Sequence, residues 1–240
     1  MNLFDVYPLF SIEPIKGQGC YVTDKDGKTY LDFYGGHAVI SIGHSHPHYV
    51  QKISEQVSKL GFYSNSVQNP LQLELAEKLG DLSGCNKYDL FLCNSGAEAN
   101  EAAIKIARRY GNAKGYALPK IIVMESAFHG RTLATLSATG NPKVHEGFTP
   151  LVDGFIRVPF DDADAVAAVL KENNDIAAIL VEPVQGEGGV HIPAPGYLKA
   201  LRELADQHDV LLMLDEIQTG IGRTGQWFSH QHEDIVPDVM

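Results

Sequence analysis

The side chains best suited to chemistry stand directly behind short apolar runs. Asp215 follows the run 210–214, and Gln218 comes three residues later. A short apolar run between turn signals is typical of a strand buried on both faces of a parallel sheet, which puts Asp215 at the strand's carboxyl end. Open α/β sheets bind ligands at that edge. A carboxylate there could bind a metal, a ribose, a base or a cationic ring nitrogen, and Asp215 alone leaves these alternatives open.

A second candidate site follows the run 88–93, which we predict to be a strand. Ser95, with Glu98 three residues later, forms a capping-box pattern that predicts a helix start. Free N–H groups and the helix dipole favour an anion such as phosphate there, and the small side chains of Gly96 and Ala97 would let it approach closely. Many turns of this kind bind nothing, so this pattern alone leaves phosphate binding open.

Two more loops follow predicted strands at 121–124 and 176–181. In the first, Phe128 offers a stacking face and Arg131 a fork for a carboxylate, although a core phenylalanine beside a surface arginine is an equal alternative. In the second, residues 181–189 (VEPVQGEGG) again place an acid at a strand end, before a glycine-rich loop.

Strands that alternate with helices must position these residues. They predict an α/β fold with a mostly parallel sheet, helices on both faces, and one shared crevice at its carboxyl edge. We expect an N-terminal segment at 1–45 with a hairpin, followed by a large domain at 46–240. The other predicted elements are hairpin strands at 20–23 and 29–33, amphipathic helices after 47 and 70, a strand at 154–158, and helices opening at 161–162 and spanning 195–208.

Three alternating histidines, His44, His46 and His48, could place metal ligands on one side of an extended segment. No acid or cysteine stands near them in the sequence, and Pro47 favours helix entry. We therefore interpret them as polar loop residues that open a helix, and we expect no metal.

The composition of the chain argues against some classes of binding partner and some cellular locations. The formal net charge of −11 argues against nucleic acid and anionic membrane surfaces. Three widely spaced cysteines favour a reducing compartment. The first ten residues lack a basic signal region, and no stretch approaches the roughly 18 apolar residues of a membrane span. We expect a cytoplasmic protein.

The nature of the ligand can be narrowed further. GxGxxG does not occur between the first predicted strand and helix, where a dinucleotide site would need it, and GxxxxGK[ST] does not occur at all, which argues against nucleotides. The candidate residues offer a binding site for a phosphate, an aromatic ring for stacking, a carboxylate and a glutamine. This combination suits a flat, phosphorylated pyridine ring.

The sequence resembles the class III pyridoxal-phosphate aminotransferases, and within them most resembles the acetylornithine aminotransferase group. The class resemblance covers nearly the whole chain and lies in residues 94–102 (NSGAEANEA), 128–132 (FHGRT), 181–183 (VEP) and 214–220 (LDEIQTG). The group resemblance lies in residues 43–47 (GHSHP), 137–140 (SATG), 146–148 (EGF) and 222–225 (GRTG).

The resemblance implies fold type I and pyridoxal 5′-phosphate as cofactor, and it assigns roles to the candidate residues. Asp215 would bind the pyridinium nitrogen, which lets the ring absorb electrons. Arg131 would bind the α-carboxylate of the amino acid, and Glu187 resembles a gating acid that pairs with an arginine outside this sequence. The implied cofactor-binding residues are Ser95, Gly96, Ala97, Phe128, Asp215, Ile217 and Gln218.

The resemblance also implies a lysine that forms a Schiff base with the cofactor. By the family's pattern it would lie about four positions beyond Met240, outside the chain, which would leave the sheet and the C-terminal domain incomplete.

The implied reaction transfers the δ-amino group of N-acetylornithine to 2-oxoglutarate, in a homodimer. One alternative is ornithine or another ω-amino acid as donor. Another is a catalytically inactive fragment or split-enzyme subunit that only binds pyridoxal or pyridoxamine phosphate.

Overall fold

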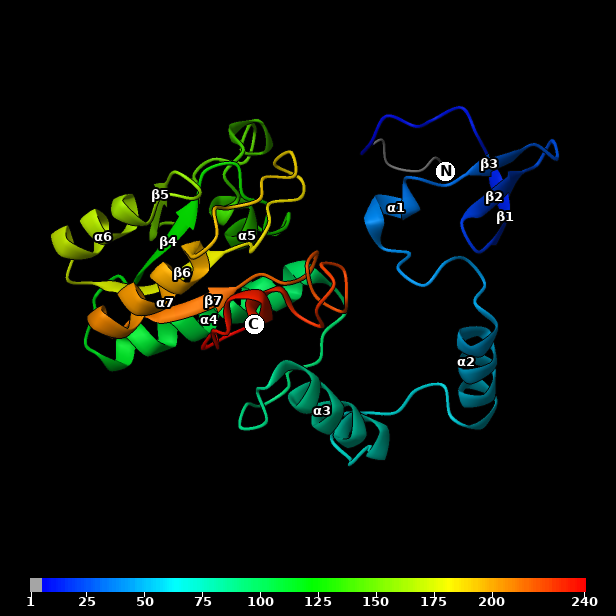
Figure 1. Cartoon of the computed structure of the whole chain (residues 1–240), viewed down its shortest axis with the longest axis horizontal. Helices are drawn as coiled ribbons and strands as arrows, with labels where there is room; N and C mark the ends of the chain where they lie inside the picture. Colours follow the sequence, from blue (N-terminus) through cyan, green and yellow to red (C-terminus); the bar gives the residue numbers. More distant parts are fainter. Residues whose placement is uncertain (1–5) are drawn as a thin grey trace. The chain divides into compact units, whose positions relative to one another are not determined.

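The computed structural model of this protein describes residues 6–240, which form two compact units divided between Asn69 and Pro70 (Figure 1). Each unit is described by itself. The predicted domain boundary after residue 45 stays a prediction, and the part of the N-terminal expectation that concerns residues 1–5 lies outside the described residues.

The first unit contains the predicted hairpin, extended by one strand that was not predicted. Its antiparallel strands, in the order β1-β2-β3, are β1 (Pro14–Gln18), β2 (Tyr21–Asp24) and β3 (Thr29–Leu31). Asp24 fixes the hairpin turn, because its Oδ1 accepts the N–H groups of Asp26 (3.0 Å) and Lys28 (2.9 Å). The turn prediction for residues 24–27 is confirmed.

The loop that carries His44 is tied to this sheet. His44 exchanges two backbone hydrogen bonds with Gly19, and its Nε2 lies 2.7 Å from Asp32 Oδ2. The hydrogen bond from His44 lowers the pKa of the Asp32 carboxyl. No acid stands near these histidines in the sequence, but the fold brings Asp32 back to His44. Within the described residues, no group of three His, Cys, Asp or Glu side chains could hold a metal.

Helices complete this unit and open the next. They are α1 (Gly35–Ala38), α2 (Pro47–Lys59) and α3 (Pro70–Ser83). The two predicted amphipathic helices are thus confirmed, and His46 is the N-cap residue of α2 as the loop-to-helix interpretation requires. No residue of α2 is buried, so its predicted sheet-covering role stays a prediction.

The second unit is built on a four-stranded parallel sheet in the order β5-β4-β6-β7 (Figure 1). The strands are β4 (Lys120–Met124), β5 (Phe155–Val158), β6 (Ile176–Val181) and β7 (Leu211–Leu214). All four were predicted. Every residue of β6 is buried, as a near-continuous apolar strand in the middle of a parallel sheet requires.

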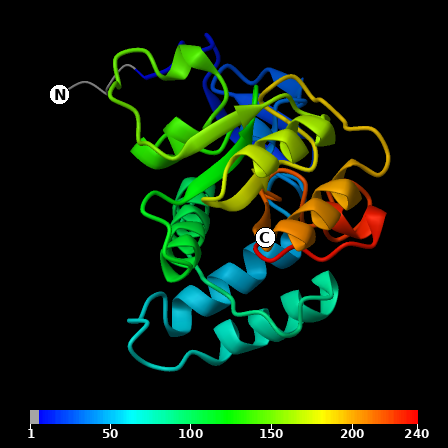
Figure 2. The same cartoon turned by 90° about the vertical axis from the view of Figure 1, so that its left-hand side faces the viewer.

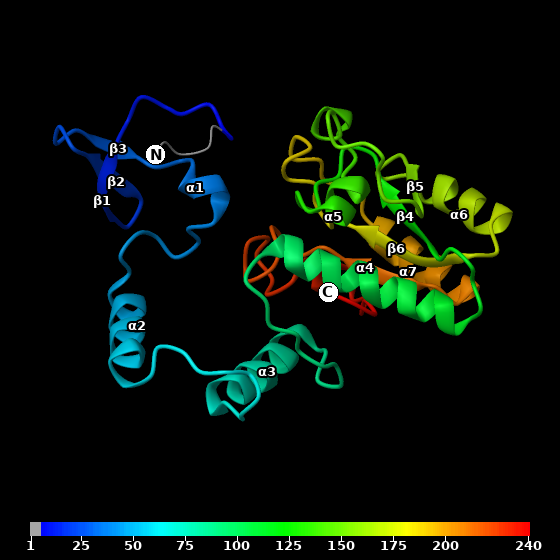
Figure 3. The ribbon, with the colours of Figure 1, turned by 180° about the vertical axis from the view of Figure 1, so that it is seen from behind.

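Helices cover both faces of this sheet, as predicted. They are α4 (Gly96–Ala113) and α5 (Leu133–Ala138) on one face, and α6 (Ala163–Glu172) and α7 (Tyr197–His208) on the other. Successive strand residues alternate between the two layers: Ile122 and Met124 pack with α6 and α7, while Ile121 and Val123 pack with α4. The view of Figure 1 has α7 in front of the sheet, and α4 is in front in the reverse view of Figure 3. In the view turned by 90°, α4 (green) and α7 (orange) lie on opposite sides (Figure 2).

The strand predicted at 88–93 does not form. The segment has no regular structure, and Phe91 is exposed. A strand requires a ladder partner, and neither edge strand of the four-stranded sheet pairs with this segment. At the β7 edge, Met213 instead forms an isolated bridge with Val239. Apolar composition alone therefore gave the wrong element here.

The remaining elements are two short 3₁₀ helices, η1 (Pro142–Val144) and η2 (Ser229–Glu233). Within residues 6–240, no helix combines the length and the apolar character that a bilayer crossing requires.

Candidate active site

The carboxylate of Asp215 occupies the carboxyl end of β7 and is nearly buried. Its backbone N–H donates to the carbonyl oxygen of Val181 at the end of β6 (2.9 Å). Its Oδ2 accepts from Asn100 Nδ2 (2.7 Å) and from His129 Nδ1 (2.8 Å), and its Oδ1 accepts the Ile217 N–H (3.2 Å). Four hydrogen bonds therefore fix both the backbone and the carboxylate plane.

Two of these partners, Asn100 and His129, were not assigned a role from the sequence. Asn100 is a buried amide on the α4 face that otherwise carries Ala103, Ile104 and Ala107. A polar residue on an apolar helix face was the available signal. His129 lies within a motif that the sequence singled out, but its ring position depends on the fold. Its Nδ1 donates to the carboxylate, while its buried Nε2 has no hydrogen-bond partner among the described residues.

The N-terminus of α4 has the expected cap. The Glu98 N–H donates to Ser95 Oγ (3.3 Å), so the first half of the predicted capping box is confirmed. The Glu98 carboxylate accepts the N–H of Asn94 (2.9 Å), one residue before the usual position. Hydrogen bonds from Asn94 and Ser95 lower the pKa of Glu98. Within the described chain, the N–H groups of Gly96 and Ala97 have no acceptor.

This helix start lies against two other candidate segments. A Cβ atom built on Gly96 would come within 2.9 Å of Ile217 Cδ1, and one built on Gly130 would come within 2.9 Å of Ala97 Cβ. Gly130 also has a φ of 133°, which disfavours any side chain. The absence of side chains at these two positions therefore lets the α4 start, the 128–131 loop and the segment after β7 meet.

Phe128 is held in place through its backbone. Its N–H donates to Glu182 Oε2 (2.9 Å), at the end of β6. Burial raises the pKa of the Glu182 carboxyl to about 7, although the neighbouring His129 and the Phe128 N–H act in the opposite direction. The guanidinium of Arg131 lies over the Phe128 ring, with Cζ 5.7 Å from the ring centre. Arg131 is exposed.

The glycine-rich loop after β6 joins the same edge. A Cβ atom on Gly186 would meet Gln218 Cγ at 3.7 Å, so Gln218 lies beside this loop. The buried Gln185 anchors the loop by donating from Nε2 to the carbonyl oxygen of Glu125 (2.8 Å). Glu187 is exposed, and no ion-pair partner for it exists among the residues that the structure describes.

Most of the residues predicted from the sequence are thus brought to one edge of the sheet. Contacts within this edge link Gly96, Ala97, Phe128, Arg131, Asp215, Ile217 and Gln218, and Ser95 caps the adjoining helix. Glu187 is exposed in the adjoining loop. The arrangement offers free N–H groups, an aromatic ring and a fixed carboxylate, which suits an anionic ligand with a cationic ring nitrogen.

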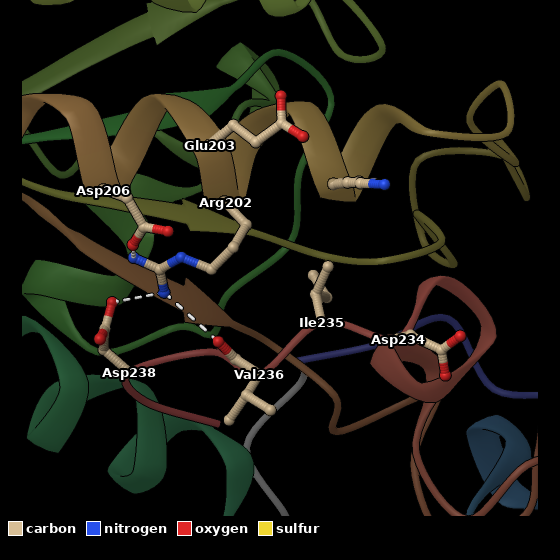
Figure 4. Close-up of a pocket in the computed structure, with 8 residues that line it drawn as sticks. Arg202, Glu203, Asp206, Asp234, Ile235, Val236 and Asp238 are labelled. Atoms are coloured by element: carbon tan, nitrogen blue, oxygen red, sulfur yellow. Dashed lines mark hydrogen bonds and ion pairs between the residues drawn. The ribbon is translucent and has the colours of Figure 1, made fainter.

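A hollow of about 430 Å³ lies elsewhere, between α7 and residues 234–238 (Figure 4). Arg202 crosses it and donates from Nη1 to Asp238 Oδ2 (2.8 Å) and to the carbonyl oxygen of Val236 (3.4 Å). The same Asp238 oxygen accepts the Leu212 N–H (2.7 Å). None of the predicted site residues lines this hollow, and its contacts fasten the 236–238 segment to β7.

Comparison with known proteins gives matches over almost the whole chain. The family model described as aminotransferase class-III matches residues 6–240. The acetylornithine aminotransferase of Nitrosomonas europaea is 52% identical over 239 residues, which cover 100% of this chain and 60% of that protein. That of Methanocaldococcus jannaschii is 46% identical over 236 residues, which cover 98% of this chain and 58% of that protein. The chain therefore spans about 60% of the length of these curated relatives.

Solved structures agree. The crystal structure of the ornithine aminotransferase from Toxoplasma gondii ME49 has a TM-score of 0.92 at 35% identity, with 98% of this chain and 56% of that chain covered. The acetylornithine aminotransferase from Elizabethkingia anophelis has a TM-score of 0.80 at 39% identity, with 98% and 55% covered.

Proposed function

The chain belongs to the class-III aminotransferase family and has fold type I, and on this premise we propose that the complete gene product is a pyridoxal-phosphate-dependent aminotransferase. We propose N-acetylornithine as the donor of a δ-amino group and 2-oxoglutarate as the acceptor. The observation that carries this proposal is the 52% identity, across the chain, to a protein named acetylornithine aminotransferase.

The residues present fit the cofactor. The N–H groups of Gly96 and Ala97 at a capped helix start suit its phosphate, and Gly96 has no Cβ atom to hinder the approach. Phe128 would stack on the ring, while Ile217 and Gln218 would complete its binding. When bound, pyridoxal phosphate supplies an electron sink for the substrate carbon that loses a proton.

Asp215 would hold a proton on the ring nitrogen. Its carboxylate is fixed by Asn100, His129 and the Ile217 N–H, so it is pre-oriented and needs no rearrangement to accept a hydrogen bond. Arg131 would bind the substrate's α-carboxylate in a bidentate fork, which leaves the distal amine to react. Glu187, exposed in the adjoining loop, would form the gate.

The remaining proposals concern assembly and location. We infer a homodimer from family membership and a cytoplasmic location from the three widely spaced cysteines.

The substrate proposal is tested on the complete gene product loaded with cofactor. Purified protein is mixed with N-acetylornithine, ornithine or 4-aminobutyrate, and glutamate formation from 2-oxoglutarate is measured. We expect kcat/KM to be highest for N-acetylornithine. A higher value for ornithine would instead establish the ornithine alternative, and no glutamate with any donor would contradict the aminotransferase proposal.

Replacing Asp215 by asparagine tests its role. We expect Asp215→Asn to lower kcat by about 10²-fold or more while cofactor stays bound, because the neutral amide cannot stabilise a protonated ring nitrogen. The change is measured by steady-state kinetics beside cofactor absorbance. Asp164→Asn, at an exposed carboxylate of α6, is the control and should keep wild-type turnover. Unchanged turnover in Asp215→Asn would remove Asp215 from this role.

A further inference from the structure

Asn100 is a buried polar side chain that would not itself touch the substrate in the proposed reaction. It lies in the second turn of α4, and its neighbours on the buried helix face are Ala103, Ile104 and Ala107. An amide on such a face is costly unless it is hydrogen-bonded, so its contacts indicate what it does there.

Both N–H bonds of this amide are used. Nδ2 donates to the carbonyl oxygen of His129 (2.9 Å) and to Asp215 Oδ2 (2.7 Å). Because both partners only accept, the orientation of the amide is fixed by its chemistry, and its oxygen cannot occupy that position. One side chain thereby joins the helix with the free N–H groups, the loop that carries Phe128, and the acid after β7.

The hydrogen bonds on Asp215 also constrain its carboxylate. Oδ2 receives two donors, Asn100 and His129, and Oδ1 receives the Ile217 N–H. Without the Asn100 bond, the His129 ring would be the only side chain holding Oδ2 among the described residues, and the plane of the carboxylate could turn about that bond. A change at Asn100 would therefore alter the orientation of the Asp215 carboxylate and, with it, the hydrogen bond from the ring nitrogen.

We propose that Asn100 is a positioning residue, which aims the Asp215 carboxylate at the ring nitrogen of the cofactor and sets its distance from the phosphate-binding start of α4. This inference rests on the proposed function. It differs from a packing role, because packing against an apolar layer would be served as well by leucine, which has the same branched shape and no donor.

Asn100→Leu separates the two roles. It is made in the complete gene product and loaded with pyridoxal 5′-phosphate carrying ¹⁵N in the ring. The control is Ile104→Val, which trims the same buried helix face one turn later without touching Asp215. Four quantities are measured: the ¹⁵N chemical shift of the ring nitrogen, kcat and KM for the amino donor, and the unfolding temperature of the cofactor-free protein.

We expect Asn100→Leu to move the ring-nitrogen signal toward the unprotonated position and to lower kcat by about 10- to 100-fold, with KM changed less. The control should change neither, and the unfolding temperatures of the two variants should be similar. Asn100→Ser retains one hydroxyl donor and should give an intermediate kcat. It also provides the test if the leucine variant does not fold.

A wild-type ring-nitrogen signal and wild-type kcat in Asn100→Leu, or in Asn100→Ser if only that variant folds, would overturn the inference and leave the proposed function intact. A loss of kcat matched by Ile104→Val would also overturn it, since packing would then explain the effect. If the wild-type protein gives no signal from bound cofactor, the proposed function itself fails, and this inference fails with it.

Discussion

The carboxyl group of Glu182 is buried beside His129 and Asp215, and its raised pKa makes stability depend on pH. The pKa is 4.5 for an unperturbed glutamate and about 7 in the folded protein. Below pH 4.5 both states are protonated and the group contributes nothing. As the pH rises toward 7, the unfolded state ionises first, so the folded state loses about 3 kcal/mol.

Glu182→Gln should remove this loss. Glutamine keeps an oxygen that can accept the Phe128 N–H but carries no charge. We expect the free energy of unfolding to fall less between pH 5 and pH 8 in the variant than in the wild type, as measured by urea denaturation. Glu203→Gln, at an exposed carboxylate, is the control and should keep the wild-type dependence. Identical dependence in Glu182→Gln would contradict a charged, buried Glu182 above pH 7.

The role of a site residue could be predicted where it depends on residues adjacent in the sequence. Ser95 caps the helix that its own pattern predicts, and Asp215 ends the strand that precedes it. Asn100 and His129 contact Asp215 across the fold, so their partners could be read only from the structure. The sequence shows that Asn100 is a polar residue on an apolar helix face. It does not show which acceptors bind its amide.

Among the elements, the contact between the 128–131 loop and α4 depends on a missing side chain. A Cβ atom at Gly130 would lie 2.6 Å from Thr135 Oγ1 and 2.9 Å from Ala97 Cβ, and the backbone φ of 133° is strained for any other residue.

Gly130→Ala should therefore destabilise the protein by about 2–3 kcal/mol and weaken cofactor binding, because the loop must move off the helix start. The control is Gly115→Ala, which also has a positive φ but open space around its Cβ position, and it should cost less and leave cofactor binding unchanged. Urea denaturation and cofactor titration measure both effects. Equal results for the two variants would mean that the close contact is unimportant.

A strand was predicted correctly where the local sequence pattern favours a strand and the folded sheet also supplies a pairing partner. The strands β4 to β7 are apolar runs between turn signals, and each finds a neighbour in the sheet. Residues 88–93 carry a similar pattern but no ladder partner among the described residues. Pairing is a property of the assembled sheet, which explains why one of these similar segments failed to become a strand.

At the scale of the whole second unit, the spacing between α4 and the sheet sets the geometry of the site. Ala107 is fully buried between them, and small residues on this helix face allow close packing. A larger side chain would push the helix outward, and with it Asn100 and the free N–H groups.

Ala107→Leu should cost about 1–3 kcal/mol of stability by overpacking and should also weaken cofactor binding. The neighbouring Ile106 is 46% exposed, so Ile106→Leu is the matched control and should change neither. Urea denaturation gives the first quantity and cofactor titration the second. If Ala107→Leu lost stability but kept wild-type affinity, the site would be insensitive to the helix–sheet spacing.

The bond between Asn100 and Asp215 joins residues 115 positions apart in the chain. Closing a loop of that length is entropically costly, and β7 holds Asp215 beside the helix through its pairing with β6 in the sheet. The binding edge therefore needs both ends of this loop in their folded places. A ligand that binds at this edge stabilises the folded protein relative to forms in which the loop is open.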